Sequence, residues 1–138
     1  MLCGVQIDHP RGLAGHSDAD VGLHALMDAL LGAAGLGDIG DLFPDTDPAF
    51  AGIASMELLR RVIARVNEAG WLVANADVTL VCERPHLAGY RLAMREGLAS
   101  TLGVGGDAVS VKATTTEGMG FEGRGEGIAA FAVCLLSR

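Results

Sequence analysis

Residues 16–24 constrain this chain most, because two histidines and two aspartates stand there at the start of a long apolar run. Ser17, with Asp20 three residues later, has the form of an N-terminal capping box with aspartate in place of the usual Glu or Gln. The apolar residues that follow recur at helical spacing. The pattern predicts a helix over residues 18–34, with acidic residues in its first turn and Gly35 at its end.

One face of this predicted helix carries three polar side chains. Asp20, His24 and Asp28 are spaced by four residues, so they lie above one another. A carboxylate one turn away on either side can fix the tautomer of His24, which suits a metal ligand or a proton-transfer group. The alternative is a capped helix with one hydrogen-bonded histidine and no further role.

Residues 35–48 are rich in glycine and proline and carry four aspartates, at positions 38, 41, 45 and 47. This composition predicts an irregular loop, and long irregular loops in compact domains are often functional. Ile39, Leu42 and Phe43 would anchor the loop against the core. The alternative is a solvated acidic turn.

Residues 112–127 form a second stretch whose composition indicates chemistry. Thr114, Thr115 and Thr116 offer hydroxyls and amides to phosphate oxygens, Glu117 can hold a hard divalent cation, and the glycines allow close backbone approach. No Walker A pattern is present, since Lys112 precedes the threonines. A threonine-rich strand end followed by a glycine hairpin is the ordinary structural alternative.

Hydrophobic periodicity and turn residues predict the remaining elements. Ser55 would cap a second helix that Gly70 ends, and a weaker helix would cover residues 87–102. Strands are predicted over residues 2–7, 71–83, 108–113 and 127–136. In the second of these strands, Ala76, Val78, Leu80 and Cys82 would share one buried face.

Composition narrows the class of protein. The chain has 138 residues, half of them hydrophobic, which fits one domain over residues 1–138 and suggests that apolar surface is buried between subunits. A formal net charge of -7 argues against nucleic acid as a partner. Cys3, Cys82 and Cys134 form no C-x-x-C pair, which favours reduced thiols, and no apolar run is long enough to span a membrane. We therefore expect a cytoplasmic protein.

Three motifs together resemble one known family. They are GLAGHSDADVGLHAL at residues 12–26, GDIGDLFPDTDP at residues 37–48 and KATTTEGMGFEGRGEG at residues 112–127. In this order and spacing they resemble the 2-C-methyl-D-erythritol 2,4-cyclodiphosphate synthases of the non-mevalonate isoprenoid pathway. The resemblance implies an α+β fold with a mixed β-sheet, helices packed on one face and chorismate-mutase-like topology. It also implies a homotrimer with the sheets around the three-fold axis and active sites between neighbouring subunits.

The resemblance implies a reaction as well. A phosphorus–oxygen lyase of this family converts 4-diphosphocytidyl-2-C-methyl-D-erythritol 2-phosphate into 2-C-methyl-D-erythritol 2,4-cyclodiphosphate and CMP, with zinc and magnesium or manganese as cofactors. The 2-phosphate attacks the β-phosphate of the same molecule. Such phosphoryl transfer depends on alignment and charge neutralisation more than on a protein nucleophile, and the sequence suggests no Ser–His or Cys–His pair.

Residues that match the family motifs take their expected roles from the resemblance. His24 resembles a zinc ligand, and Glu117 resembles the ligand of the magnesium or manganese at the diphosphate. His16 and Ser17 match residues that touch substrate phosphate, and His16 with Thr115 matches a pair that stabilises the transition state. The other expected substrate-binding residues are Asp38, Ile39, Gly40, Phe43, Pro44, Asp45, Thr46 and Asp47 for methylerythritol; Cys82, Glu83, Arg84, Pro85, His86, Leu87, Ala88, Thr114, Thr115 and Thr116 for cytidine; and Phe121 and Arg124 near the substrate or the trimer axis.

The sequence departs from the family pattern at its start. The family begins with a Gly-x-Asp-x-His strand whose aspartate and histidine are two further zinc ligands, and this sequence starts beyond that point. Asp8 and His9 are adjacent, so they substitute poorly for Asp-x-His. We expect an incomplete version of a normal enzyme. The alternatives are a natural short form without zinc or activity, and a metal site that another group completes.

Two functions of other classes stay open. A non-catalytic trimer would bind cytidine nucleotides or isoprenoid diphosphates through the intact threonine stretch. A purely structural acidic domain would leave the clustering of His, Asp, Thr and Glu in three loops unexplained.

Overall fold

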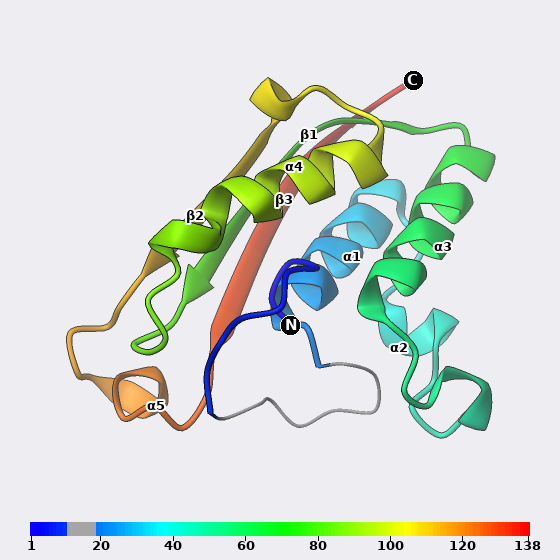
Figure 1. The fold of residues 1–138 in the computed structure, drawn as a ribbon. Coiled ribbons are helices and arrows are strands. Elements are labelled where there is room, and N and C mark those ends of the chain that lie inside the picture. The colour runs from blue at the N-terminus through cyan, green and yellow to red at the C-terminus, as the bar shows by residue number, and fades with distance from the viewer. Residues whose placement is uncertain (11–18) are drawn as a thin grey trace.

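The computed structural model describes residues 1–10 and 19–138, and Figure 1 shows how their helices and strands are arranged. None of the helices within these ranges is long and apolar enough to cross a membrane. The helices are α1 (Val21–Ala34), α2 (Ile39–Leu42), α3 (Ser55–Glu68), α4 (Arg91–Leu102) and α5 (Gly120–Gly123), with 3-10 helices η1 (Pro48–Phe50), η2 (Ala88–Tyr90) and η3 (Gly106–Ala108). The strands are β1 (Leu72–Val81), β2 (Val109–Thr114) and β3 (Ala129–Ser137).

The strands form a three-stranded sheet in the order β2-β1-β3. β1 pairs in parallel with β2, with Ala76 opposite Val109, and antiparallel with β3, where Ala76 lies opposite Cys134. The parallel pair needs a crossover connection, and α4 supplies it. The α+β class and the mixed sheet expected from the sequence are therefore confirmed.

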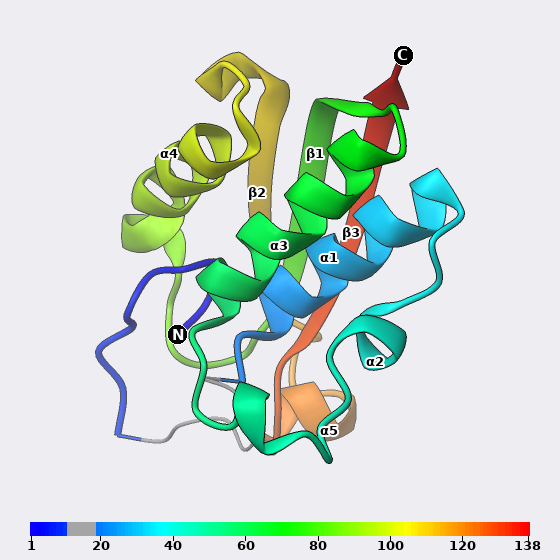
Figure 2. The same cartoon turned by 90° about the vertical axis from the view of Figure 1, so that its right-hand side faces the viewer.

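Helices α1, α3 and α4 lie on one face of the sheet, as Figure 2 shows. Ala76, Val78 and Leu80 of β1 point into this layer and are buried, which confirms the predicted face of this strand. The other face is apolar but uncovered, because Phe131, Val133 and Leu135 of β3 are 65%, 70% and 58% exposed. A chain of this size rarely leaves so much apolar side chain in contact with water.

Asp20, rather than Ser17, is the N-cap of α1, so the predicted capping box is wrong. The helix begins at Val21, and Asp20 Oδ1 accepts hydrogen bonds from Leu23 N at 3.0 Å and Cys3 N at 2.8 Å. Asp20 Oδ2 accepts from Gly4 N at 2.8 Å. The carboxylate therefore lies outside the first turn, fully buried, and joins α1 to the N-terminal residues.

The strand predicted over residues 2–7 is also wrong. Leu2 and Val5 form one isolated bridge, with hydrogen bonds of 2.9 Å in both directions around a tight turn. Cys3 and Gly4 at the turn have φ of 46° and 78°, a left-handed backbone that Asp20 holds through both amides. The alternating apolar residues fit a short strand as well as a tight turn. The local pattern could not predict the turn, because the carboxylate that holds it, that of Asp20, is distant in sequence.

The other predicted helices and strands are present with smaller corrections. Ser55 is the first residue of α3 and not its cap, since Ala54 is the N-cap and makes no side-chain hydrogen bond. The acidic loop is less irregular than predicted, because Asp38 and Asp41 form a capping box on α2. Its anchors Ile39, Leu42 and Phe43 pack against the core as expected. The predicted helix over residues 87–102 divides into η2 and α4, and the glycine-rich stretch between β2 and β3 contains the short helix α5.

Stability is expected to fall at high pH because of Cys3. Burial, with the nearby Asp20 charge as a smaller cause, raises the pKa of this thiol from 9.0 to about 12. The folded state keeps a proton that the unfolded chain releases, so the free energy of unfolding should decrease as pH rises from about 9 towards 12. Urea unfolding across this pH range tests the prediction. The Cys3→Ala variant should show a clearly shallower slope, and an equal slope would contradict the assignment.

Candidate functional site

A pocket of about 400 Å³ lies beside α1 and is named here the His24 pocket. His24 enters it from α1, while Asp45 and the rings of Phe43 and Phe50 come from the acidic loop and η1. The two rings pack edge to face with centroids 5.2 Å apart, and this contact holds the acidic loop against η1. The complete lining is His24, Ile39, Gly40, Phe43, Pro44, Asp45, Phe50 and Leu58.

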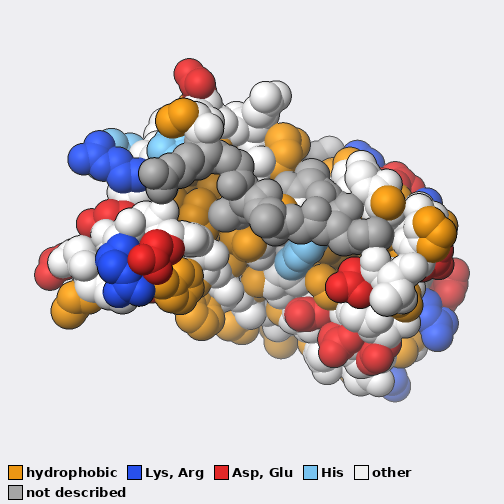
Figure 3. Space-filling view, turned by 90° about the horizontal axis from the view of Figure 1, so that it is seen from below, with side chains coloured by type: hydrophobic (Ala, Val, Ile, Leu, Met, Phe, Trp, Pro, Cys, Tyr) orange, Lys and Arg blue, Asp and Glu red, His pale blue; other side chains and the backbone are white. Residues whose placement is uncertain are grey.

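The His24 pocket contains residues that the sequence assigns to methylerythritol. Its lining includes Ile39, Gly40, Phe43, Pro44 and Asp45. The remaining residues of that group, Asp38, Thr46 and Asp47, lie next to it in the chain but outside the lining. Figure 3 shows carboxylates gathered at this end of the molecule, over the loop that carries these aspartates.

His24 is positioned by a serine that the sequence did not suggest. Ser55 is fully buried at the start of α3, and its Oγ lies 3.4 Å from His24 Nε2. Asp28 Oδ1, by contrast, accepts from Ile39 N at 2.9 Å and so holds α2 against α1. Asp20 and Asp28, which were predicted to share a helix face with His24, therefore both accept hydrogen bonds from backbone amides. No periodic pattern could place Ser55 there, since it is 31 residues from His24.

A second pocket of about 180 Å³ lies where β1 and β2 end, and is named here the threonine pocket. Thr114 and Thr115 line it, together with Arg91, the first residue of α4. Arg91 was not predicted as a lining residue, although it lies only three residues after Ala88, the end of the predicted cytidine segment. The complete lining is Cys82, Pro85, His86, Leu87, Ala88, Arg91, Ala113, Thr114 and Thr115.

Hydrogen bonds join the two segments predicted to hold cytidine. Cys82 N donates to Thr114 O at 2.9 Å, and Thr116 N donates to Glu83 Oε2 at 3.4 Å. Burial raises the pKa of the Cys82 thiol, whose Sγ donates to the Arg84 carbonyl at 3.0 Å. The thiol is therefore protonated near neutral pH and serves as a structural donor.

The loop after β2 holds its functional candidates in a fixed turn. Glu117 N donates to Thr115 Oγ1 at 3.2 Å, and Thr116 Oγ1 donates to Met119 O. Because Thr115 Oγ1 accepts here, its own O–H can still donate to a ligand. Glu117 has φ of 54° and is exposed at the tip of the loop. Glu83, Thr116 and Glu117 flank the threonine pocket without lining it.

Phe121 and Arg124 lie on α5 and directly after it, and both are exposed. Arg124 donates to both carboxylate oxygens of Glu126, at 2.8 and 3.1 Å, and this hydrogen bonding raises the pKa of the guanidinium. Arg84 is not part of the lining of the threonine pocket and instead lines a hollow of about 200 Å³ together with His9 and Glu126. The roles predicted for these arginines stay predictions.

The described residues fit the two expected metals differently. In residues 1–10 and 19–138, no group of three or more His, Cys, Asp or Glu side chains could hold a metal ion. A catalytic zinc site generally uses three protein ligands, so His24 with this surrounding does not make one. Magnesium or manganese fits better, because such ions often bind one carboxylate together with substrate phosphates, and Glu117 offers one beside three threonines. His16 and Ser17 lie outside the described residues.

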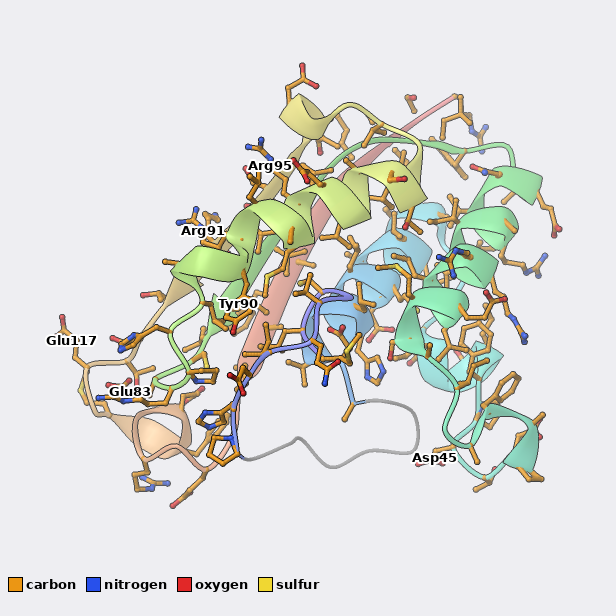
Figure 4. The ribbon with its side chains drawn as sticks, viewed as in Figure 1. Asp45, Glu83, Tyr90, Arg91, Arg95 and Glu117 are labelled. Carbon is orange, nitrogen blue, oxygen red and sulfur yellow. The ribbon has the colours of Figure 1, made fainter. Side chains whose placement is uncertain are left out.

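The two pockets lie at opposite sides of the chain. Figure 4 places Asp45 below α2, whereas Glu83, Arg91 and Glu117 lie on the opposite side of the molecule, near the start of α4 and the loop after β2. One chain therefore presents two separate groups of candidate residues rather than one assembled site.

Solved structures of one class of enzyme share this fold. A structure described as 2C-methyl-D-erythritol-2,4-cyclodiphosphate synthase in a CDP-bound form matches with a TM-score of 0.91 and 39% identity over 99% of this chain and 89% of that chain. The bifunctional IspDF of Campylobacter jejuni matches with a TM-score of 0.94 and 47% identity, over 99% of this chain and 37% of the longer one.

Sequence comparison agrees with the structural match. The chain is 62% identical to the 2-C-methyl-D-erythritol 2,4-cyclodiphosphate synthase of Methylococcus capsulatus over 138 residues, all of this chain and 87% of that protein. The model of the YgbB family matches residues 1–137. The chain belongs to the YgbB family.

Proposed function

We propose that this protein is a 2-C-methyl-D-erythritol 2,4-cyclodiphosphate synthase that acts as a phosphorus–oxygen lyase. It converts 4-diphosphocytidyl-2-C-methyl-D-erythritol 2-phosphate into the cyclodiphosphate and CMP. The observation that carries the proposal is the identity of about 60% to proteins of this name along the whole chain. The His24 and threonine pockets support it, because they contain residues of the expected methylerythritol and cytidine groups respectively.

Within this proposal, the chain binds and aligns the substrate. The His24 pocket holds the methylerythritol part, with the Asp45 carboxylate accepting from its hydroxyls. The threonine pocket holds cytidine, as the CDP-bound relative suggests, and Thr115 donates to the diphosphate. Alignment of the 2-phosphate with the β-phosphate supplies most of what an intramolecular transfer needs. His16 and Ser17 belong to the proposal as phosphate contacts.

We propose a homotrimer whose active sites form between neighbouring subunits. The separation of the two pockets in one chain supports this, since a substrate that spans both needs a second copy. The uncovered apolar face of β3, with Phe131, Val133 and Leu135, supports packing of sheets around a three-fold axis. The free cysteines Cys3, Cys82 and Cys134 support a cytoplasmic location.

The proposal includes metal ions only in part. Magnesium or manganese, held by Glu117 and substrate phosphate, would neutralise phosphate charge when bound. Zinc at His24 needs ligands beyond those of the described residues, so no step is assigned to it. Metal analysis of the purified protein tests zinc binding.

The decisive experiment measures CMP release from the diphosphocytidyl substrate by the purified chain with zinc and magnesium present. Steady turnover is expected once the chain is extended at its start by a Gly-x-Asp-x-His strand, which supplies the two further zinc ligands that the family pattern implies. CDP binding by calorimetry without turnover and without zinc would instead favour the second candidate, a non-catalytic trimer that binds cytidine nucleotides. Two observations favour that candidate. The threonine pocket is intact, and residues 1–10 and 19–138 contain no group of three side chains that could hold a metal ion.

A further inference from the structure

The threonine pocket differs in charge from the rest of this acidic chain. Arg91 and His86 are the lining residues whose side chains can carry a positive charge, and Thr114 and Thr115 add hydroxyls. Among the residues that the structure describes, no Asp or Glu lines this pocket. The whole chain has a formal net charge of -7, so an anionic ligand needs a cation close at hand.

Most cations in the described part of the chain are already engaged. Arg84, Arg91 and Arg95 are the described arginines that neither pair with a carboxylate nor stack on a ring, and of these Arg91 alone lines the threonine pocket. The engaged residues are Arg60 and Arg61 with Glu57, Arg65 with Glu68, Lys112 with Asp77, Arg124 with Glu126, and Arg138 over the Trp71 ring.

Arg91 is also held in position by the backbone. Its Nε donates to Val111 O at 2.9 Å, on the outer edge of the sheet, since β2 is an edge strand. Only one of the five guanidinium N–H groups is used in this contact, so the two terminal nitrogens can donate to a ligand. A guanidinium fixed by one hydrogen bond loses less freedom on binding than a mobile one.

We propose that Arg91 binds the phosphate part of the nucleotide that occupies the threonine pocket. This rests on the proposed function, which puts the cytidine diphosphate part of the substrate there. Hydrogen bonds between a guanidinium and phosphate are charge-assisted and stronger than neutral ones. Arg91 therefore contributes affinity for the phosphates and little for the nucleoside.

Titration calorimetry with CDP and with cytidine tests the proposal on the full chain. Arg95→Gln is the matched control, because Arg95 lies one turn further along α4, is exposed and is outside the pocket lining (Figure 4). Arg91→Gln should weaken CDP binding by about tenfold or more and change cytidine binding less than about twofold. Arg91→Lys should lose less, since it keeps the charge, and Arg95→Gln should bind as the unchanged protein does.

Two results would overturn the inference while leaving the proposed function intact. One is an equal loss of CDP and cytidine affinity in Arg91→Gln, which would indicate that Arg91 only supports the edge of β2. The other is CDP binding in Arg91→Gln that matches Arg95→Gln. If the unchanged protein binds neither ligand, the proposed function itself is wrong and this inference falls with it.

Discussion

Replacing Asp20 with alanine is expected to lower the free energy of unfolding by about 3–5 kcal/mol. The change removes the cap of α1 and leaves the amides of Cys3, Gly4 and Leu23 without their acceptor. Because this carboxylate is fully buried, water cannot replace it without opening the structure. Urea unfolding at one fixed protein concentration measures the loss.

Asp38→Ala is the matched control for this prediction. Asp38 also caps a helix, α2, but it is exposed, so its loss should cost about 1 kcal/mol. Asp20→Asn should behave more like Asp20→Ala than like the control, because its amide group would face a backbone donor. A loss in Asp20→Ala no larger than in Asp38→Ala would show that the N-terminal turn does not depend on this carboxylate.

CMP release by the Glu117→Gln variant is expected to fall by at least about 100-fold, within the proposed function. Glutamine keeps the size of the side chain but removes the negative charge at the tip of the loop after β2. The turn itself should persist, since Glu117 contributes its backbone amide to the Thr115 hydroxyl. The measurement is the rate of CMP release at several magnesium concentrations.

Glu122→Gln provides the comparison for this second prediction. Glu122 lies in the following helix, α5, and outside every residue group assigned to the substrate. Its substitution should change CMP release less than about twofold. Equal rates for the two variants, whether both high or both low, would argue against a specific role of the Glu117 charge.

Local sequence patterns predicted much of the fold because their causes are local. The alternation in β1 and the apolar spacing of α1 follow from which face of an element is buried, and both are confirmed. The acidic and threonine-rich loops were also recognisable, since their glycine and proline content excludes long regular elements. The strand over residues 2–7 failed because a tight turn and a short strand share the same alternating pattern.

For the candidate site too, some residues were predictable from the sequence and others only from the structure. The sequence by itself indicated His24, Asp45, Thr115 and Glu117 through residue type and motif. Only the tertiary structure decided that Asp20 holds the N-terminal turn, that Ser55 meets His24 and that Arg91 borders the threonine pocket.

The physical reason is the distance along the chain. A capping or periodic pattern extends over one or two turns, whereas the contact of Ser55 with His24 depends on how α3 packs against α1. The position of the two pockets at opposite sides of the chain has the same origin. Sequence thus determined which groups are present, and packing decided which of them meet.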